Sequence, residues 1–258
     1  MSTILEVVRI PVLNDNYVWL IREPKSNAVG VVDPAVAPPV LAEAARRGWK
    51  ITHILNTHHH GDHIGGNREI VAATGCIVVG PKADHARIPG MDVEVDDGDT
   101  YMFGEAKAEI FFVPGHTSGH IAFAFREQRA LFCGDTIFAL GCGKMFEGTP
   151  QQFWRSLSRL RDLPDDMRVY CAHEYTQSNA RFAVTIETDN KQLMARSASV
   201  NAARARGEAT VPSLLGEEKQ TNPFMRADVP SLQKAVGMLG RDPAAVFAEV
   251  RHRKDVFR

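Results

Sequence analysis

The chain has 258 residues, of which 44% are hydrophobic and 24% are charged. This composition is ordinary for a folded protein with a sizeable core, and it excludes an intrinsically disordered chain. The 30 Lys and Arg residues balance the 31 Asp and Glu residues to a formal net charge of −1. That balance argues against a nucleic-acid partner, because proteins of that class usually carry a basic excess. No apolar run reaches the roughly 18 residues of a membrane-spanning helix, so we expect no membrane partner.

The first residues of the chain and its cysteines indicate the cellular compartment in which the protein is expected to reside. Residues 1–6 lack a basic segment followed by an apolar one, so the sequence predicts no signal peptide. Four cysteines occur without a close CxxC pair: Cys76, Cys133, Cys142 and Cys171. We expect them to be buried, free thiols in a reducing compartment. The sequence is thus predicted to be that of a cytoplasmic protein, and we expect a monomer.

Strand and helix signals alternate over the first two thirds of the chain. Apolar and β-branched runs predict strands at residues 4–10, 17–21, 29–32, 51–57, 76–79, 100–103, 109–113, 121–125, 130–133 and 169–172. Helices are predicted at residues 40–47, 64–73 and 151–161. This alternation is typical of a mixed α/β domain, which we assign to residues 1–173.

The composition changes after His173. Residues 177–207 are rich in helix formers, whereas residues 208–223 are polar and are predicted to be irregular. Two further helices are predicted at residues 230–239 and 242–254, the second with Asp242 as its cap and Pro243 at its first position. We therefore predict a helical domain at residues 174–258.

A dense histidine motif, Thr57-His58-His59-His60-Gly61-Asp62-His63, follows a predicted strand and precedes a helix. In extended chain, residues two apart point the same way, so His58 and His60 can reach one metal ion while His59 turns away. The adjacent Asp62 and His63 diverge from that pair and suit a second ion. Imidazole and carboxylate without thiolate suit Zn²⁺ or another borderline divalent ion.

Three more candidate ligands, His116, Asp135 and His173, each lie just past a predicted apolar strand. Active-site residues of layered α/β folds gather at such strand ends. A single buried histidine is usually an ordinary core residue, but seven spaced candidates seldom arise together by chance. The remaining histidines lie off the motif and are assigned no metal role: His53, His59, His85, His120 and His252.

The order T-H-x-H-x-D-H, then G-H, then G-D, then a final H resembles the signature of the metallo-β-lactamase superfamily. The resemblance covers residues from about 10 to 173 and implies an αββα sandwich. It also implies that His58, His60 and His116 bind a first ion. By the same resemblance, Asp62, His63 and His173 bind a second ion, and Asp135 bridges both. We expect two Zn²⁺ ions, with iron or manganese as the alternatives.

Such a centre favours hydrolysis. Two divalent ions that share a water make hydroxide available near neutral pH and stabilise the oxyanion formed on attack. The ions carry +4, Asp62 and Asp135 carry −2 and one hydroxide carries −1, so the reacting centre keeps a charge of +1. We therefore expect metal-bound hydroxide to be the nucleophile, with Asp62 and Asp135 as the catalytic residues. The centre alone does not choose among ester, thioester, amide and phosphodiester substrates.

Motifs along the whole chain resemble the glyoxalase II family, the hydroxyacylglutathione hydrolases. They are Asn14-Asp15-Asn16-Tyr17, Gly141-Cys142-Gly143-Lys144, His173-Glu174-Tyr175-Thr176, Ser178-Asn179, Gly216-Glu217-Glu218-Lys219, Thr221-Asn222-Pro223-Phe224 and Arg251-His252-Arg253-Lys254-Asp255. The resemblance implies hydrolysis of S-lactoylglutathione to glutathione and lactate, the second step of methylglyoxal detoxification.

By the same resemblance, the helical domain binds substrate, and glutathione is held by Lys144, Tyr175, Arg251 and Lys254. The carboxylates of glutathione make cations and a phenol suitable partners. A thiol with a pKa near 8.5 leaves without a dedicated acid. The chain has Phe146 where the family often has tyrosine, so one hydroxyl contact to glutathione is missing or supplied elsewhere.

Three alternatives stay open from the residues alone. A nuclease of the same fold would need a basic surface, and a single-iron persulfide dioxygenase usually lacks the long helical domain. A non-catalytic protein with structural metal ions would leave no coordination position open for water. Metal content per chain together with hydrolysis of S-lactoylglutathione distinguishes all of these.

Overall fold

The computed structural model describes residues 4–257. Residues 1–3, part of the segment on which the absence of a signal peptide was predicted, lie outside this range. The chain divides into two compact units. Unit 1 runs to Phe112 and includes Gly119–Gly134, and unit 2 comprises Val113–Ser118 and the chain from Asp135 onward. These bounds come from contacts within each unit, whereas the division at residue 173 was predicted from composition and stays a prediction.

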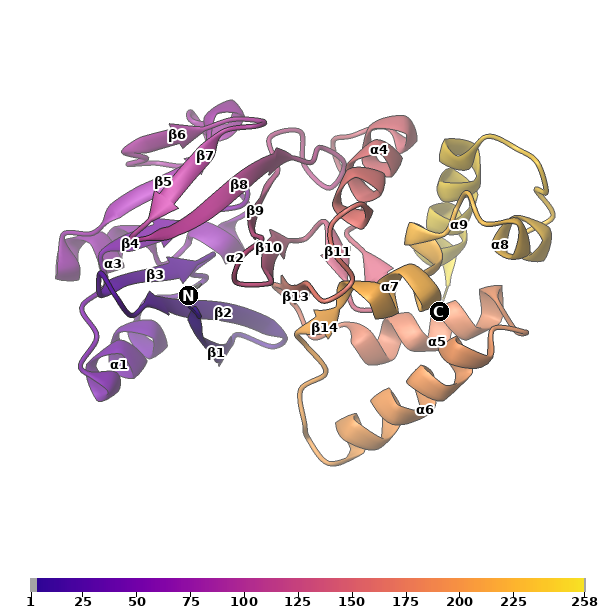
Figure 1. Ribbon diagram of the computed structural model, residues 1–258, viewed down its shortest axis with the longest axis horizontal. Coiled ribbons are helices and arrows are strands. Elements are labelled where there is room, and N and C mark those ends of the chain that lie inside the picture. Colours follow the sequence, from indigo (N-terminus) through magenta and orange to yellow (C-terminus); the bar gives the residue numbers. More distant parts are fainter. Residues whose placement is uncertain (1–3, 258) are drawn as a thin grey trace. The chain divides into compact units, whose positions relative to one another are not determined.

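Unit 1 begins with a six-stranded sheet whose strands follow the chain order (Figure 1). They are β1 (Glu6–Val12), β2 (Asn16–Glu23), β3 (Ala28–Val32), β4 (His53–Leu55), β5 (Ile77–Pro81) and β6 (Val93–Val95). The first three pair antiparallel, and β3 to β6 pair parallel. The parallel pairing of β3 with β4 puts Val32 opposite Leu55, so the residues that follow these two strands meet at one sheet edge.

A second run of strands in unit 1 is an antiparallel meander. It consists of β7 (Thr100–Phe103), β8 (Ala106–Phe112), β9 (Ile121–Phe125) and β10 (Ala130–Gly134). The ring of His53 on β4 meets the ring of Phe103 on β7 edge-on at 5.2 Å. The two sheets of unit 1 therefore pack face to face, and His53 is a core contact, as its position off the motif predicted.

The helices of unit 1 are α1 (Pro38–Arg47), α2 (Gly61–Ile64) and α3 (Asn67–Thr74), with a 3₁₀ turn η1 (Lys82–Asp84). The helix predicted at residues 64–73 corresponds to α3, which starts only at Asn67 because Gly65 and Gly66 separate it from α2. A Cβ on Gly65 would lie 2.5 Å from the carbonyl oxygen of Ala35, and the amide of Gly66 donates to Pro34. The two glycines thus let this bend pass against the backbone that follows β3.

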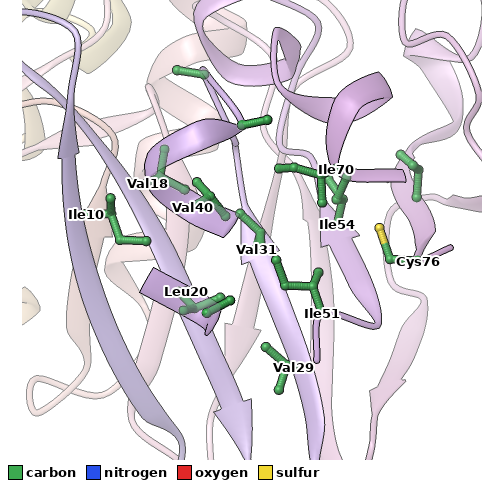
Figure 2. Packing of buried hydrophobic residues seen from close by; sticks show 14 of the residues in the cluster. Ile10, Val18, Leu20, Val29, Val31, Val40, Ile51, Ile54, Ile70 and Cys76 are labelled. Carbon is green, nitrogen blue, oxygen red and sulfur yellow. The ribbon is translucent and has the colours of Figure 1, made fainter. Parts of the chain in front are cut away.

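The core of unit 1 lies between the first sheet and helices α1 and α3, and Figure 2 shows its packing at close range. Fully or nearly fully buried members include Ile10, Val18, Leu20, Val29, Val31, Val40, Ile51, Ile54 and Ile70. Strands β2 and β3 are buried along almost their whole length, as continuous apolar runs predict.

Unit 2 contains short strands and most of the helices. The elements are β11 (Ile137–Phe138), β12 (Gly141–Cys142), α4 (Pro150–Arg161), β13 (Arg168–Cys171), α5 (Thr176–Ile186), α6 (Lys191–Ala205), β14 (Ser213–Leu214), α7 (Leu215–Thr221), η2 (Pro223–Met225), α8 (Pro230–Ala235) and α9 (Pro243–Val256). Among residues 4–257, none of the helices has the length and apolarity needed to cross a membrane.

The prediction that residues 208–223 are irregular is wrong, because this segment contains β14 and α7. The amide of Leu215 donates to the carbonyl of Met167, and Leu215 and Glu218 are fully buried. Tertiary contacts therefore order a polar segment whose own pattern is weak. The predicted helix at residues 230–239 is also shorter, since α8 ends at Ala235 and Gly237 turns with a φ of 76°.

Other predictions are confirmed. Asp242 caps α9 by accepting from the amide of Ala245, and Pro243 occupies the first helical turn. All four cysteines are free and buried. Burial raises the pKa of Cys142 to about 11 and that of Cys171 to about 12, so both are inert thiols near neutral pH.

Candidate metal centre

The four predicted ligands of the histidine motif gather at the end of β4 in unit 1. His58 and His63 are fully buried, and the ring of His58 lies 4.1 Å from that of His63 and 4.7 Å from that of His60. Asp62 reaches His63, with Oδ2 3.6 Å from Nε2. His59 points elsewhere, because its Nδ1 lies 3.1 Å from Asp84 Oδ2.

Asp33, which the sequence analysis missed as a functional residue, organises this group. It follows β3 and is 3% exposed. Its Oδ1 accepts from the amide of Thr57 at 2.8 Å, and its Oδ2 accepts from the Thr57 hydroxyl at 2.7 Å. The same Oδ2 lies 3.1 Å from His63 Nδ1. A carboxylate directly after an apolar strand was the available signal, and it is the same signal that selected the later candidates.

These contacts fix the tautomers of two histidines. A carboxylate only accepts hydrogen bonds, so His63 donates from Nδ1 to Asp33. The single hydroxyl proton of Thr57 also goes to Asp33, so His58, whose Nδ1 lies 3.0 Å from that hydroxyl, donates to it. Both rings therefore carry their proton on Nδ1 and present Nε2 as a lone-pair donor, the arrangement in which a carboxylate orients metal-binding histidine.

Asp62 is held from another element of unit 1. The side-chain amide of Asn16, at the start of β2, donates to Asp62 Oδ2 at 3.0 Å, and Asn16 is 7% exposed. Asn16 is therefore an orienting residue, drawn from the motif at residues 14–17.

The three later candidates gather in unit 2 around Asp135. Its Oδ2 lies 3.4 Å from Nε2 of His116 and 3.5 Å from Nε2 of His173. His116 and His173 are each 4% exposed, and Asp135 is 6% exposed. One carboxylate therefore faces two imidazole nitrogens within unit 2.

Backbone and aromatic contacts orient the two histidines of unit 2. Nδ1 of His116 lies 2.7 Å from the carbonyl oxygen of Lys144, so His116 also carries its proton on Nδ1 and presents Nε2 towards Asp135. The ring of His173 stacks on Tyr175 at 4.7 Å with 5° between the ring planes. Phe138 meets both of these rings edge-on.

The four residues that the resemblance assigns to glutathione lie in unit 2 in different surroundings. Lys144 is exposed, and Tyr175 is half-buried against His173. Lys254 is half-buried, and its Nζ lies 3.4 Å from the carbonyl oxygen of Ser178. Burial and the nearby Arg251 lower the pKa of Lys254. These three residues have surfaces that a solute can reach.

Arg251 differs from the other three because it is 6% exposed. Its guanidinium pairs with Asp255 at 2.9 Å and donates to the carbonyl of Cys142 at 3.3 Å. These are internal contacts, which give Arg251 a role within the fold.

Phe146, the departure from the family pattern, is 59% exposed. Its ring meets that of His116 edge-on at 5.3 Å, and the ammonium of Lys144 lies 5.4 Å from its centroid. The side chain therefore offers a solute an apolar ring beside a candidate ligand, in place of a phenol.

The donor set fits borderline divalent ions. His58, His63 and His116 present Nε2 donors with their tautomers fixed, and Asp62 and Asp135 supply carboxylate oxygens. Neutral imidazole and carboxylate are the ligands of catalytic zinc and of non-haem iron.

Two family models match the chain in tandem. The model of the metallo-β-lactamase superfamily matches residues 13–173, and the model of the hydroxyacylglutathione hydrolase C-terminus matches residues 174–257. Together they account for both the mixed α/β part and the helical part of the chain.

Curated relatives that match this chain over nearly their full length are named hydroxyacylglutathione hydrolase. The protein of Methylococcus capsulatus is 59% identical over 98% of this chain and 99% of its own. That of Rhodospirillum rubrum is 53% identical over the whole of both chains.

Solved structures share the fold. ETHE1 from Myxococcus xanthus superposes with a TM-score of 0.70 at 22% identity, covering 98% of this chain and 92% of its own. A protein crystallised in a di-iron-bound form superposes with a TM-score of 0.60 at 24% identity, covering 85% and 99%. The chain thus has the metallo-β-lactamase fold with a helical C-terminal region, and it belongs to the hydroxyacylglutathione hydrolase family.

Proposed function

We propose that the chain hydrolyses S-(2-hydroxyacyl)glutathione thioesters, chiefly S-lactoylglutathione, to glutathione and a 2-hydroxy acid. It is a thioester hydrolase by family. The observation that carries the proposal is the union, in one chain, of oriented His and Asp donors with a C-terminal region that matches the hydroxyacylglutathione hydrolase model. In a cell, this reaction would be the second step of methylglyoxal detoxification.

The metal assignment is part of the proposal. His58, His60 and His116 are proposed to bind one divalent ion and Asp62, His63 and His173 a second, with Asp135 bridging both. Zinc suits this donor set, and iron and manganese are the alternatives. Bound ions of this kind supply hydroxide near neutral pH and stabilise an oxyanion.

The chain's own residues would then orient donors and substrate. Asp33 and Asn16 hold His63 and Asp62 in their binding geometry. Lys144, Tyr175, Arg251 and Lys254 are proposed to bind glutathione, whose carboxylates pair with the cations. The glutathione thiol leaves as thiolate without a dedicated acid because its pKa is low.

The remaining assignments follow from composition. We propose a cytoplasmic monomer that acts on a small molecule and binds neither nucleic acid nor membrane. The net charge of −1 and the buried free thiols support this.

Metal removal tests the reaction. Exhaustive chelation is expected to abolish hydrolysis of S-lactoylglutathione, and added Zn²⁺ is expected to restore it, because the donors act through bound ions. The rate is measured as released thiol. The metal content is measured by elemental analysis and is expected to be two ions per active chain. The lactoyl thioester of mercaptoethanol, which has the same acyl group and lacks glutathione, is the control for glutathione recognition. It is expected to react far more slowly. Full activity in a verified metal-free sample would contradict the proposal.

The two cations of α9 are expected to differ. Lys254→Ala should raise KM for S-lactoylglutathione by about ten- to a hundredfold, the factor that corresponds to a charge-assisted bond of about 1.5–3 kcal/mol. The turnover number kcat should change by less than about threefold, since a contact remote from the thioester contributes equally to ground and transition states. Solvent screening favours the lower end of the KM range for this half-buried group.

Arg251→Ala is expected to raise KM as well, and in addition to lower the free energy of unfolding by about 1.5–3 kcal/mol, because its buried bond to Cys142 is lost. Steady-state kinetics and denaturant unfolding of both variants separate these effects. An unchanged KM in Lys254→Ala would remove that residue from the glutathione site.

A further inference from the structure

Five successive residues of a short hairpin in unit 2 form hydrogen bonds with side chains of the helical region. Strands β11 and β12 pair through Phe138 and Gly141, and we call residues 138–142 the strap. Five successive backbone groups bond to side chains: Phe138 O and Gly141 O accept from Asn222, Ala139 O accepts from Asn179, Leu140 N donates to Glu218 and Cys142 O accepts from Arg251. The distances run from 2.8 Å for Gly141 to 3.3 Å for Cys142.

The side chains that hold the strap are themselves buried and fixed. Asn222 and Glu218 are fully buried, and Asn222 also donates to Glu218 at 3.1 Å. Glu218 in turn pairs with the guanidinium of Arg196. A buried polar network that is satisfied in this way is rigid, because each group has its partner and no water competes.

Leu140 shows how firmly the strap is held. It has a φ of 59°, a left-handed conformation that bulky residues rarely adopt. Its side chain is fully buried with Ala180, Ala183 and Leu193 of helices α5 and α6. Surroundings that keep a residue in such a conformation over-determine its position.

The strap ends at the candidate metal centre. Gly143 follows it directly, and a Cβ there would lie 2.2 Å from the carbonyl oxygen of Asp135 and 2.9 Å from Nδ1 of His116. The next carbonyl, of Lys144, is the one that His116 Nδ1 contacts at 2.7 Å. The position of the strap therefore decides where the acceptor for His116 stands.

We propose that Asn222, Glu218 and Asn179 are positioning residues for metal binding. They hold the strap so that the Lys144 carbonyl accepts the Nδ1 proton of His116 and keeps Nε2 as the ligand atom. The helical region thus acts on the metal ions as well as on glutathione. The inference rests on the proposed function in one respect, because it takes His116 as a metal ligand.

Asn222→Asp tests the idea sharply. The remaining oxygen of Asp can still accept from the amide of Phe224, as Asn222 does at 3.1 Å, so the cap of η2 is kept. The amide donor to Phe138, Gly141 and Glu218 is lost, and the new carboxylate faces that of Glu218. We expect the zinc affinity of the site that contains His116, measured by chelator competition, to fall about ten- to a hundredfold, as for other residues that orient ligands. The ¹⁵N shifts of His116 in the metal-free protein should show a mixture of tautomers in place of the Nδ1-protonated form.

Asn190→Ala is the matched control. Asn190 also caps a helix of unit 2, accepting from Leu193 and donating to the carbonyl of Gln220, but it does not contact the strap. It should lower thermal stability and keep zinc affinity within about twofold of wild type. Equal losses of affinity in Asn190→Ala and Asn222→Asp would mean that general destabilisation is responsible, and would overturn the proposal.

Two more variants complete the test. Asn179→Ala removes the single bond to Ala139, so it should lower zinc affinity severalfold, and it carries the test if Asn222→Asp does not fold. His116→Ala examines the premise, since unchanged zinc affinity in that variant would refute the metal role of His116 in the proposed function. His116→Ala could lose zinc while Asn222→Asp and Asn179→Ala keep the wild-type zinc affinity and the wild-type tautomer of His116. That result would refute the positioning role of the strap and leave the metal role of His116 intact.

Discussion

Asp135→Ala is expected to lose both metal occupancy and activity, with kcat/KM for S-lactoylglutathione falling by about a thousandfold or more. Asp135 Oδ2 lies within 3.5 Å of Nε2 of both His116 and His173, so its removal takes away the carboxylate that both histidines face. A metal ion in such a centre contributes several kcal/mol of transition-state stabilisation, and each 1.36 kcal/mol is a factor of ten in rate. Elemental analysis and thiol release measure the two losses together.

Asp189→Ala provides the control for this variant. Asp189 is an exposed carboxylate in the turn between α5 and α6 of the same unit, and its loss should leave metal content and rate at their wild-type values. Retention of two ions per chain in Asp135→Ala would show that Asp135 does not bridge, even if the rate falls.

Asp33→Asn is expected to lower the affinity of the site that contains His63 by about ten- to a hundredfold. The amide nitrogen of asparagine would donate where Oδ2 of Asp33 now accepts from Thr57 and His63. His63 would then favour the tautomer with its proton on Nε2, and Nε2 could no longer bind a metal ion. The same change of a histidine-orienting carboxylate to an amide costs a serine protease about 10⁴ in kcat. Chelator competition and the ¹⁵N shifts of His63 report the affinity and the tautomer.

The matched control is Asp84→Asn. Asp84 is a fully buried carboxylate that lies 3.1 Å from Nδ1 of His59, a histidine of the same motif without a proposed metal role. If zinc affinity falls equally in both variants, the effect of Asp33 comes from loss of buried charge and has no special connection with His63.

Local sequence signals predicted many of the strands and helices of the fold. The apolar runs located nearly all the long strands, and the cap at Asp242 with Pro243 located the start of α9. Candidate ligands were found because each follows an apolar strand, and the structure brings His116, Asp135 and His173 together within unit 2. Period-two alternation also separated His58 and His60 from His59, which turns to Asp84. These features depend on neighbours in the chain, so a sequence can report them.

Features that depend on distant partners were decided only by the tertiary structure. Asp33 acts on His63, thirty positions later, because the parallel pairing of β3 with β4 brings their ends to one sheet edge. Helix α7 is stabilised by the buried contacts of Leu215 and Glu218, which the polar pattern of its sequence does not predict. The resemblance named Arg251 only as a contact for glutathione, and the burial of its side chain against Cys142 is seen only in the fold. Hydrogen bonds between distant segments depend on where the backbone brings them, and residue spacing carries no record of that.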